Sequence, residues 1–198
     1  MPLKPVRRSV CGLEELESYR ESSVTHVLSL LDPGRDVGNS LSKFALTEHK
    51  VIHFHDIIEA CPDYVLPQPE HISEILTFGQ TPLDSANDDL GNHVLVHCFM
   101  GVSRSTAAMI TLMAQSHPEW SADELFAELR TMRPRAWPNS LIIAYADELL
   151  ERQGTLNTAL RRHYHLQLEK YPELGPWMVD LGRQREVHLA SQQHGIRN

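Results

Sequence analysis

The nine residues HCFMGVSRS, at positions 97–105, hold the most informative pattern in the chain. An apolar run, 94–96, comes directly before them, and a mostly apolar run begins at Thr106. This alternation predicts a buried strand that ends at Cys98 and a helix that begins one short loop later. The N-terminus of such a helix presents unpaired N–H groups and the positive end of its dipole, so the loop between strand and helix suits an anion.

The residue types in this loop suit phosphoryl transfer to sulfur. A thiol beside a helix N-terminus ionises more readily, and the thiolate is its nucleophilic form. Gly101 permits a backbone conformation that side chains disfavour, and Arg104 carries a planar fork that matches two phosphate oxygens. We therefore predict that Cys98 is the nucleophile and that the loop residues bind phosphate. These phosphate-binding residues are Phe99, Met100, Gly101, Val102, Ser103 and Arg104.

The arrangement His97-Cys98, five residues, Arg104 and Ser105 resembles the signature of the cysteine-dependent protein phosphatases, the tyrosine and dual-specificity superfamily. Two further stretches resemble that class: the apolar run 24–31, and RPRAWPN at 133–139, which follows the signature. The resemblance covers about residues 22–153. It implies an α/β fold, with a central, mostly parallel sheet and helices on both faces, and a metal-free reaction through a phosphocysteine.

The resemblance also assigns roles to residues that accompany the nucleophile. Ser105 is expected to hydrogen-bond the Cys98 sulfur and to ease its departure in the second step; on its own it reads as a helix N-cap. The leaving group needs an acid, and Asp56 lies where the family places that aspartate. Asp63 is the alternative. We favour Asp56 because it ends the predicted strand 50–56, which would hold it beside the strand that ends at Cys98.

Composition and charge exclude several other classes. An apolar content of 41% and a charged content of 22% are typical of a folded globular protein. No apolar run approaches the ~20 residues that span a bilayer. Residues 1–155 carry 12 Lys and Arg against 22 Asp and Glu, and this acidity disfavours nucleic acid and anionic membranes as partners. The odd number of cysteines predicts reduced thiols and a cytoplasmic location.

Histidines and the remaining cysteines do not form a pattern typical of metal binding. The pairs His53/His55 and His163/His165 have no cysteine or carboxylate at ligand spacing beside them, so we predict neither a metal nor another cofactor. Cys61 lies in the loop after the predicted acid. It is expected to be a structural free thiol, although a disulfide with the nucleophile on oxidation is an alternative.

The chain is expected to divide into a phosphatase domain, 1–155, and a C-terminal helical extension, 156–198, that is either packed or a free arm. Strands are expected at 5–10, 24–31, 50–56 and 93–96, and a polar loop at 84–92. Helices are expected at 13–19, from 69 to about 78, 106–114, from 121 to about 132, 140–152, 156–171 and 177–192.

Hydrolysis of a phosphomonoester is therefore the predicted reaction, with phosphotyrosine in a protein as the favoured substrate and phosphoserine or phosphothreonine left open. A phosphoinositide or an RNA 5′-phosphate is disfavoured, because members that act on them tend to carry polar residues where this chain has Phe99 and Met100. A non-catalytic phospho-binding module would lack one of the reactive groups, and none is missing. A sulfurtransferase, which also uses a loop cysteine, is a further alternative. The oligomeric state is not predicted.

Overall fold

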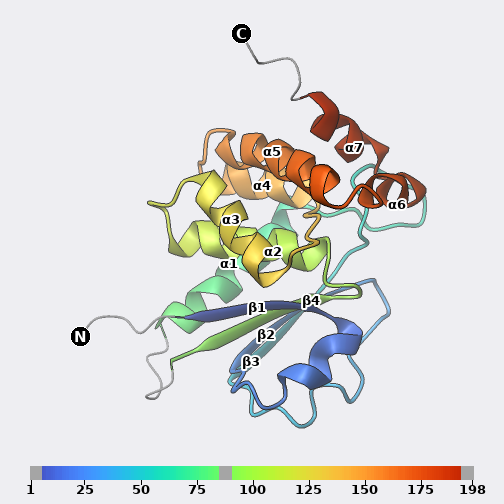
Figure 1. The fold of residues 1–198 in the computed structure, drawn as a ribbon. Coiled ribbons are helices and arrows are strands. Elements are labelled where there is room, and N and C mark those ends of the chain that lie inside the picture. Colours follow the sequence, from blue (N-terminus) through green and yellow to red (C-terminus); the bar gives the residue numbers. More distant parts are fainter. Residues whose placement is uncertain (1–5, 85–90, 193–198) are drawn as a thin grey trace.

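The centre of the computed structural model, which describes residues 6–84 and 91–192, is a sheet of four parallel strands (Figure 1). The strands are β1 (Arg7–Gly12), β2 (His26–Leu31), β3 (Glu48–His53) and β4 (His93–Cys98), in the order β1-β4-β2-β3. The predicted α/β class with a parallel sheet is confirmed. Because all four strands run the same way, their carboxyl ends meet at one edge, which is where open α/β sheets bind ligands.

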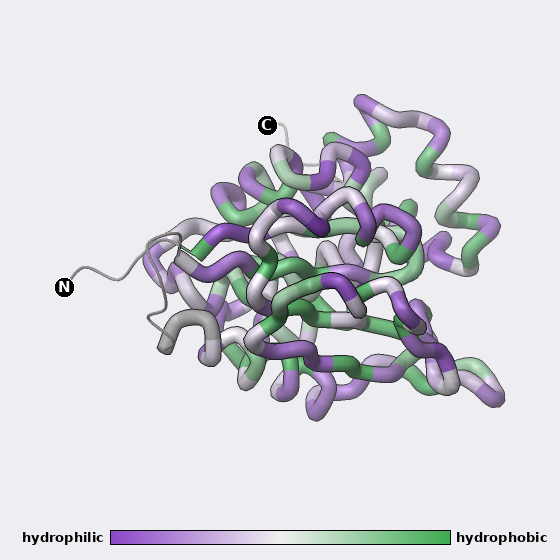
Figure 2. The backbone as a smooth tube through the Cα atoms, turned by 90° about the horizontal axis from the view of Figure 1, so that it is seen from below, coloured by the Kyte–Doolittle hydropathy of each residue, from purple (hydrophilic) through white to green (hydrophobic). Residues whose placement is uncertain are grey.

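The two inner strands, β2 and β4, are buried along their whole length. Both faces of a parallel sheet are covered, which is why these strands consist of nearly continuous apolar residues. Alternate residues of β4 face two separate cores: Val94 and Val96 belong to the larger one, and Leu95 to the smaller one. Figure 2 shows the hydrophobic stretches gathered in the interior of the molecule and hydrophilic ones along the outer turns.

Among the residues that the structure describes, all seven α-helices lie on the face of the larger core, above the sheet in Figure 1. The other face carries a 3₁₀ helix, η1 (Leu13–Tyr19), and the loop before β3. Helices therefore flank the sheet on both faces, as predicted, although the helix on the second face is a 3₁₀ helix and not an α-helix. The α-helices are α1 (Pro69–Asp84), α2 (Arg104–Ser116), α3 (Ala122–Met132), α4 (Ser140–Leu149), α5 (Thr155–Lys170), α6 (Leu174–Asp180) and α7 (Gln184–Ser191).

Helix α2 is the central helix, as its apolar sequence predicts, and every residue from Arg104 to Ala114 is buried. It contacts α1, α3, α4 and β4. Helix α3 begins with a capping box: the Ser121 hydroxyl accepts from the Glu124 N–H at 3.3 Å, and the Glu124 carboxylate accepts from the Ser121 N–H at 2.8 Å. The apolar sequence thus places α2, the helix that follows Cys98, and the capping box places the start of α3.

The C-terminal helices pack against this body. Asp147 of α4 accepts hydrogen bonds from the backbone N–H of Gly154 (2.6 Å) and Leu156 (2.7 Å), which caps the start of α5. The predicted helix 177–192 is instead two helices, because Gly182 turns the chain with φ +74° between α6 and α7. The division of the chain at residue 155 stays a prediction. Within the described ranges, no helix is long and apolar enough to cross a membrane.

The segments at 1–5, 85–90 and 193–198 lie outside the described residues, and with them most of the predicted loop at 84–92. The predicted edge strand is confirmed as β1, with bounds two residues later than expected. The strand predicted at 50–56 is β3, which ends at His53.

Candidate active site

A cleft of about 230 Å³ opens at the carboxyl ends of the inner strands. Its lining includes Cys98, Arg104 and two carboxylates, Asp32 and Asp56. Cys98 is the last residue of β4 and is 3% exposed. The predicted nucleophile and arginine, from one loop, are therefore brought to the same cleft as the predicted acid, which lies about 40 residues earlier in the chain.

The loop after Cys98 turns its carbonyl groups away from the cleft. Four of them accept hydrogen bonds from donors outside it: Phe99 O from Leu13 N (3.0 Å), Met100 O from Arg133 Nη2 (2.9 Å), Val102 O from Trp137 N (2.8 Å) and Ser103 O from Ala107 N (3.0 Å). In a trans peptide the N–H points opposite to the carbonyl. The amides that follow these carbonyls, those of Met100, Gly101, Ser103 and Arg104, are therefore directed toward the inside of the loop, where an anion would lie.

Gly101 is required at its position for two reasons. Its φ is +69°, a conformation that favours glycine. A Cβ at this position would also lie 2.4 Å from the carbonyl carbon of Cys11 and 2.4 Å from the nitrogen of Gly12. The loop thus passes directly over the end of β1, as only a residue without a side chain can.

Ser105 lies beside the predicted nucleophile, with its hydroxyl oxygen 3.2 Å from the Cys98 sulfur. Helix α2 begins at Arg104, so Ser105 belongs to its first turn and the N-cap interpretation of this serine is wrong. His97 precedes Cys98, and burial lowers the pKa of its imidazole to about 4. Its Nε2 lies 2.6 Å from the Ser29 hydroxyl, which holds the ring in the sheet as a neutral group.

Arg104 is buried and extends across the cleft to two acceptors. Its Nη1 donates to Asp32 Oδ1 and to the carbonyl oxygen of Phe54, both at 2.7 Å. Within the described part of the chain its Nε has no hydrogen-bond partner. This nitrogen therefore remains available to donate to an additional oxygen ligand in the cleft.

Asp32 was not identified as a site residue by the sequence. It directly follows β2, and β2 lies next to β4 in the sheet. An acidic residue that ends a buried strand was therefore the available signal. The side chain is 43% exposed at the edge of the cleft, and its carboxylate occupies one nitrogen of the arginine fork.

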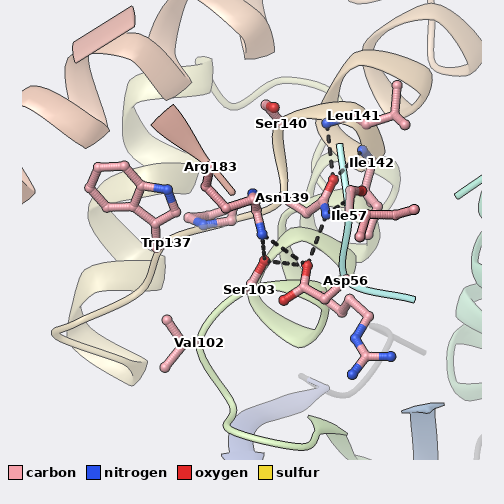
Figure 3. A network of polar contacts seen from close by, with 12 residues as sticks. Asp56, Ile57, Val102, Ser103, Trp137, Asn139, Ser140, Leu141, Ile142 and Arg183 are labelled. Carbon is pink, nitrogen blue, oxygen red and sulfur yellow. Dashed lines mark hydrogen bonds and ion pairs between the residues drawn. The ribbon is translucent and has the colours of Figure 1, made fainter. Parts of the chain in front are cut away.

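Asp56 is held by a polar network and not by the end of a strand. Strand β3 stops three residues earlier and is separated from β4 by β2, so the reason given for its position is wrong. Its Oδ1 accepts hydrogen bonds from Ser103 Oγ (2.8 Å), Asn139 Nδ2 (2.9 Å) and Arg183 Nη1 (3.0 Å), as Figure 3 shows. Burial alone would raise the pKa of Asp56, but the charges of Arg183 and then Arg104, with the hydrogen bonds from Asn139 and Ser103, together lower it below its usual value.

The other candidates from the sequence lie elsewhere. Asp63 and Cys61 are exposed and do not line the cleft. His53 Nε2 lies 2.9 Å from the carbonyl oxygen of Arg35, and His163 is buried with its Nε2 2.9 Å from the carbonyl oxygen of Ala136. In the described residues, no group of three or more His, Cys, Asp or Glu side chains could hold a metal ion.

The RPRAWPN stretch, 133–139, connects α3 to α4, and its last residue contacts the site. Asn139 caps α4 by accepting from the N–H of Leu141 (3.0 Å) and Ile142 (3.2 Å), and its amide nitrogen donates to Asp56. One residue thus joins the start of a helix to the predicted acid. Arg183, from the C-terminal helices, had no signal in the sequence.

A strand that ends at a buried cysteine, a loop with inward amides and an arginine in the first helical turn together define the cysteine-dependent phosphatase class. The chain is 38% identical over 155 residues to Protein phosphatase Slingshot homolog 3 of Homo sapiens. The matched region covers 78% of this chain and 20% of that protein. Its sequence is thus similar to that of a protein phosphatase, although no protein-family model matches it. The chain spans about a fifth of the length of this Slingshot relative.

Solved structures share the fold at low sequence identity. The Yvh1 phosphatase domain from Chaetomium thermophilum matches with a TM-score of 0.51 and 23% identity, over 75% of this chain and 93% of that one. Human DUSP28 matches with a TM-score of 0.53 and 16% identity, over 74% of this chain and 92% of that one. These likenesses establish the architecture around the cleft.

Proposed function

We propose that this chain hydrolyses phosphomonoesters through a phosphocysteine intermediate, with phosphotyrosine in a protein as its substrate. The observation that supports this proposal most strongly is the anion site above Cys98. Loop amides face inward there, and the unpartnered Nε of the buried Arg104 offers a further donor. A phosphate placed over the sulfur would take these donors, and they would stabilise the charge that spreads over its oxygens in the transition state.

In the first step, the Cys98 thiolate attacks phosphorus while the bond to the leaving oxygen breaks. Asp56 gives its proton to that oxygen, so the leaving group departs as a neutral phenol. In the second step, water attacks phosphorus, Asp56 takes its proton and the sulfur–phosphorus bond breaks. Ser105, at 3.2 Å from the sulfur, stabilises the departing thiolate by a hydrogen bond.

Asp56 must carry a proton to act in the first step. Arg183 lowers its pKa, whereas a phosphate dianion and a thiolate in the same cleft raise it. The bound substrate thus creates the protonation state that its own cleavage needs. Asp56 is favoured over Asp63 because it lines the cleft, while Asp63 lies in an exposed loop.

The walls of the cleft support an aryl substrate. They include the aromatic or apolar residues Tyr64, Phe99, Met100 and Trp177, and the first three are about half exposed. Such walls suit the ring of phosphotyrosine better than the charged headgroup of a phosphoinositide or the 5′ end of an RNA. The Slingshot relative is named a protein phosphatase, which favours a protein as the substrate.

The proposal is tested by turnover of a phosphotyrosine peptide beside a phosphoserine peptide, a phosphoinositide and thiosulfate. We expect phosphate release to be highest from phosphotyrosine. Cys98→Ser should abolish release and still bind inorganic phosphate, since the loop amides and Arg104 remain. Cys61→Ser makes the same change at an exposed thiol outside the cleft and should match the wild type.

Activity of Cys98→Ser above a few per cent would remove Cys98 as the nucleophile. Phosphate binding without turnover in the wild type would instead identify a phospho-binding module. Sulfur transfer from thiosulfate without phosphatase activity would identify a sulfurtransferase.

A further inference from the structure

Arg183 brings the C-terminal helices into the cleft. It lies at the junction of α6 and α7 and is 2% exposed. Its Nη1 is 3.0 Å from Asp56 Oδ1 and 3.1 Å from the hydroxyl of Ser103, a residue of the phosphate-binding loop. The residue is thus separated from Asp56 by more than half of the chain and still touches both the predicted acid and the loop.

The guanidinium is itself fixed from behind. Its Nη2 donates to Glu186 Oε1 at 2.7 Å, and Glu186 is completely buried. The same carboxylate accepts from Trp137 Nε1 (2.7 Å) and from the backbone N–H of Ser140 (2.8 Å). Arg183 is therefore held by a buried carboxylate that also binds the connection before α4, and this fixes the position of its guanidinium group.

The two oxygens of Asp56 differ in their surroundings. Oδ1 accepts three hydrogen bonds, from Ser103, Asn139 and Arg183, whereas Oδ2 accepts none from the described residues (Figure 3). A carboxylate anchored through one oxygen presents the other at a fixed place. Oδ2 is thus the oxygen that is available to carry a proton.

The same C-terminal segment also forms part of the cleft wall. Trp177, Met178 and Leu181 line the cleft together with Arg183, and the backbone N–H of Arg183 donates to the carbonyl of Met178 at 2.8 Å. Figure 1 shows α6 on the side of the molecule toward which the strands run. The wall and the ion pair therefore come from one short segment.

Resting on the proposed hydrolysis, we propose that Arg183 is a positioning residue of the active site: by binding Asp56 Oδ1, it presents Oδ2 to the leaving oxygen. The segment from α6 to α7 is then a working part of the phosphatase site. Arg183 would assist proton transfer to the leaving group and would leave the attack by the Cys98 sulfur unchanged.

The charged and titratable groups around Asp56 come from several elements. Arg183 at the α6–α7 junction and Arg104 of α2 both act to lower the pKa of Asp56. Behind Arg183 lie Glu186 of α7 and Tyr164 of α5. Loss of the guanidinium removes the largest of the charge effects on Asp56, so the pKa of the acid should rise.

The test measures kcat against pH for phenyl phosphate, whose leaving group needs a proton, and for 4-nitrophenyl phosphate, whose leaving group needs little help. For Arg183→Gln we expect a loss of roughly 10–10²-fold on phenyl phosphate and a smaller loss on the nitrophenyl ester. The alkaline limb of the profile should move to higher pH. Arg183→Lys, which keeps the charge, should restore part of the rate and the original limb.

Two further variants keep the test decisive. The double variant Arg183→Gln with Glu186→Gln avoids leaving a buried carboxylate unpaired, and it should show the same pattern at an unchanged Tm. Arg185→Gln makes the same substitution at a side chain that is 69% exposed and 4.0 Å from Glu59, and it should behave as the wild type.

An equal loss on both esters with an unmoved alkaline limb, in a double variant of unchanged Tm, would overturn the positioning role. A wild-type chain without turnover of either ester would overturn the proposed function, and this inference with it.

Discussion

Asp32 is placed to compete with the substrate for Arg104, and its replacement tests this directly. The contact between Arg104 Nη1 and Asp32 Oδ1 is 2.7 Å long and joins a guanidinium that is 4% exposed to a carboxylate that is 43% exposed. Water screens a pair with one partner this exposed, so the contact is worth ~1 kcal/mol or less. A phosphate must break it to take both sides of the arginine fork.

Asp32→Asn removes the competing charge and should therefore strengthen phosphate binding. A gain of ~1 kcal/mol corresponds to a Kd about fivefold lower. Calorimetric titration with inorganic phosphate measures the change in Kd directly. The inhibition constant of vanadate, measured with an aryl phosphate as the substrate, gives a second value for the change in oxyanion affinity. Asp63→Asn removes the same charge from an exposed loop and serves as the control.

An unchanged or weaker phosphate affinity in Asp32→Asn, beside an unchanged control, would refute the competition. A different result would reassign the chemistry. If affinity stays the same and kcat for a poor leaving group falls by about 10²-fold or more, Asp32 is the acid and Asp56 is not.

Four other predictions concern the same site. Asp56→Asn should lower kcat by roughly 10²–10⁴ for an aryl phosphate with a poor leaving group and less for an acidic phenol, while Asp63→Asn should match the wild type; the reverse order would transfer the role to Asp63. Arg104→Lys should lose most of its turnover, because an ammonium group cannot make the bidentate contact, and a near-normal rate would contradict phosphate binding by the fork. Gly101→Ala should lower the free energy of unfolding by roughly 2–5 kcal/mol, from its positive φ and its approach to Cys11; a urea unfolding series that gives less than ~1 kcal/mol would show that the loop moves aside. Because the pKa of Asp56 is lowered in the folded protein, its contribution to stability is present above the usual value and is lost as pH falls through the folded value. The Tm difference between wild type and Asp56→Asn should thus be largest near neutral pH and shrink in acid, and a difference independent of pH would contradict the lowered pKa.

The parts of the fold that could be predicted are those whose signals are local. The inner strand β4 and helix α2 are continuous apolar segments because each is buried on all sides, and such runs are visible in any short window. The turn at Gly101 was predictable for the same reason, since the glycine itself marks the backbone conformation. The boundaries of β3 were less certain, because its residues are only partly buried and its apolar pattern runs on past His53.

What could not be predicted depends on contacts between distant segments. Sheet order is one example: nothing local in β2, β3 or β4 says that β2 lies between the other two. The anchoring of Asp56 is another, because its donors Ser103, Asn139 and Arg183 are 47, 83 and 127 residues away. The sequence therefore indicated a carboxylate that does line the cleft, but for a reason that the structure does not support.

The outward carbonyls of the phosphate-binding loop have a consequence for how the protein meets its ligand. Donors as far apart in the chain as Leu13 and Trp137 hold these carbonyls before any anion arrives. The entropy of ordering the loop is thus lost on folding and not on binding. Oxyanion affinity then becomes a sensitive readout of distant packing: a substitution that merely loosens η1 or the 133–139 connection should weaken phosphate binding without touching a reactive group. The same coupling means that phosphate at 100 times its Kd should stabilise the folded chain by about 2.7 kcal/mol.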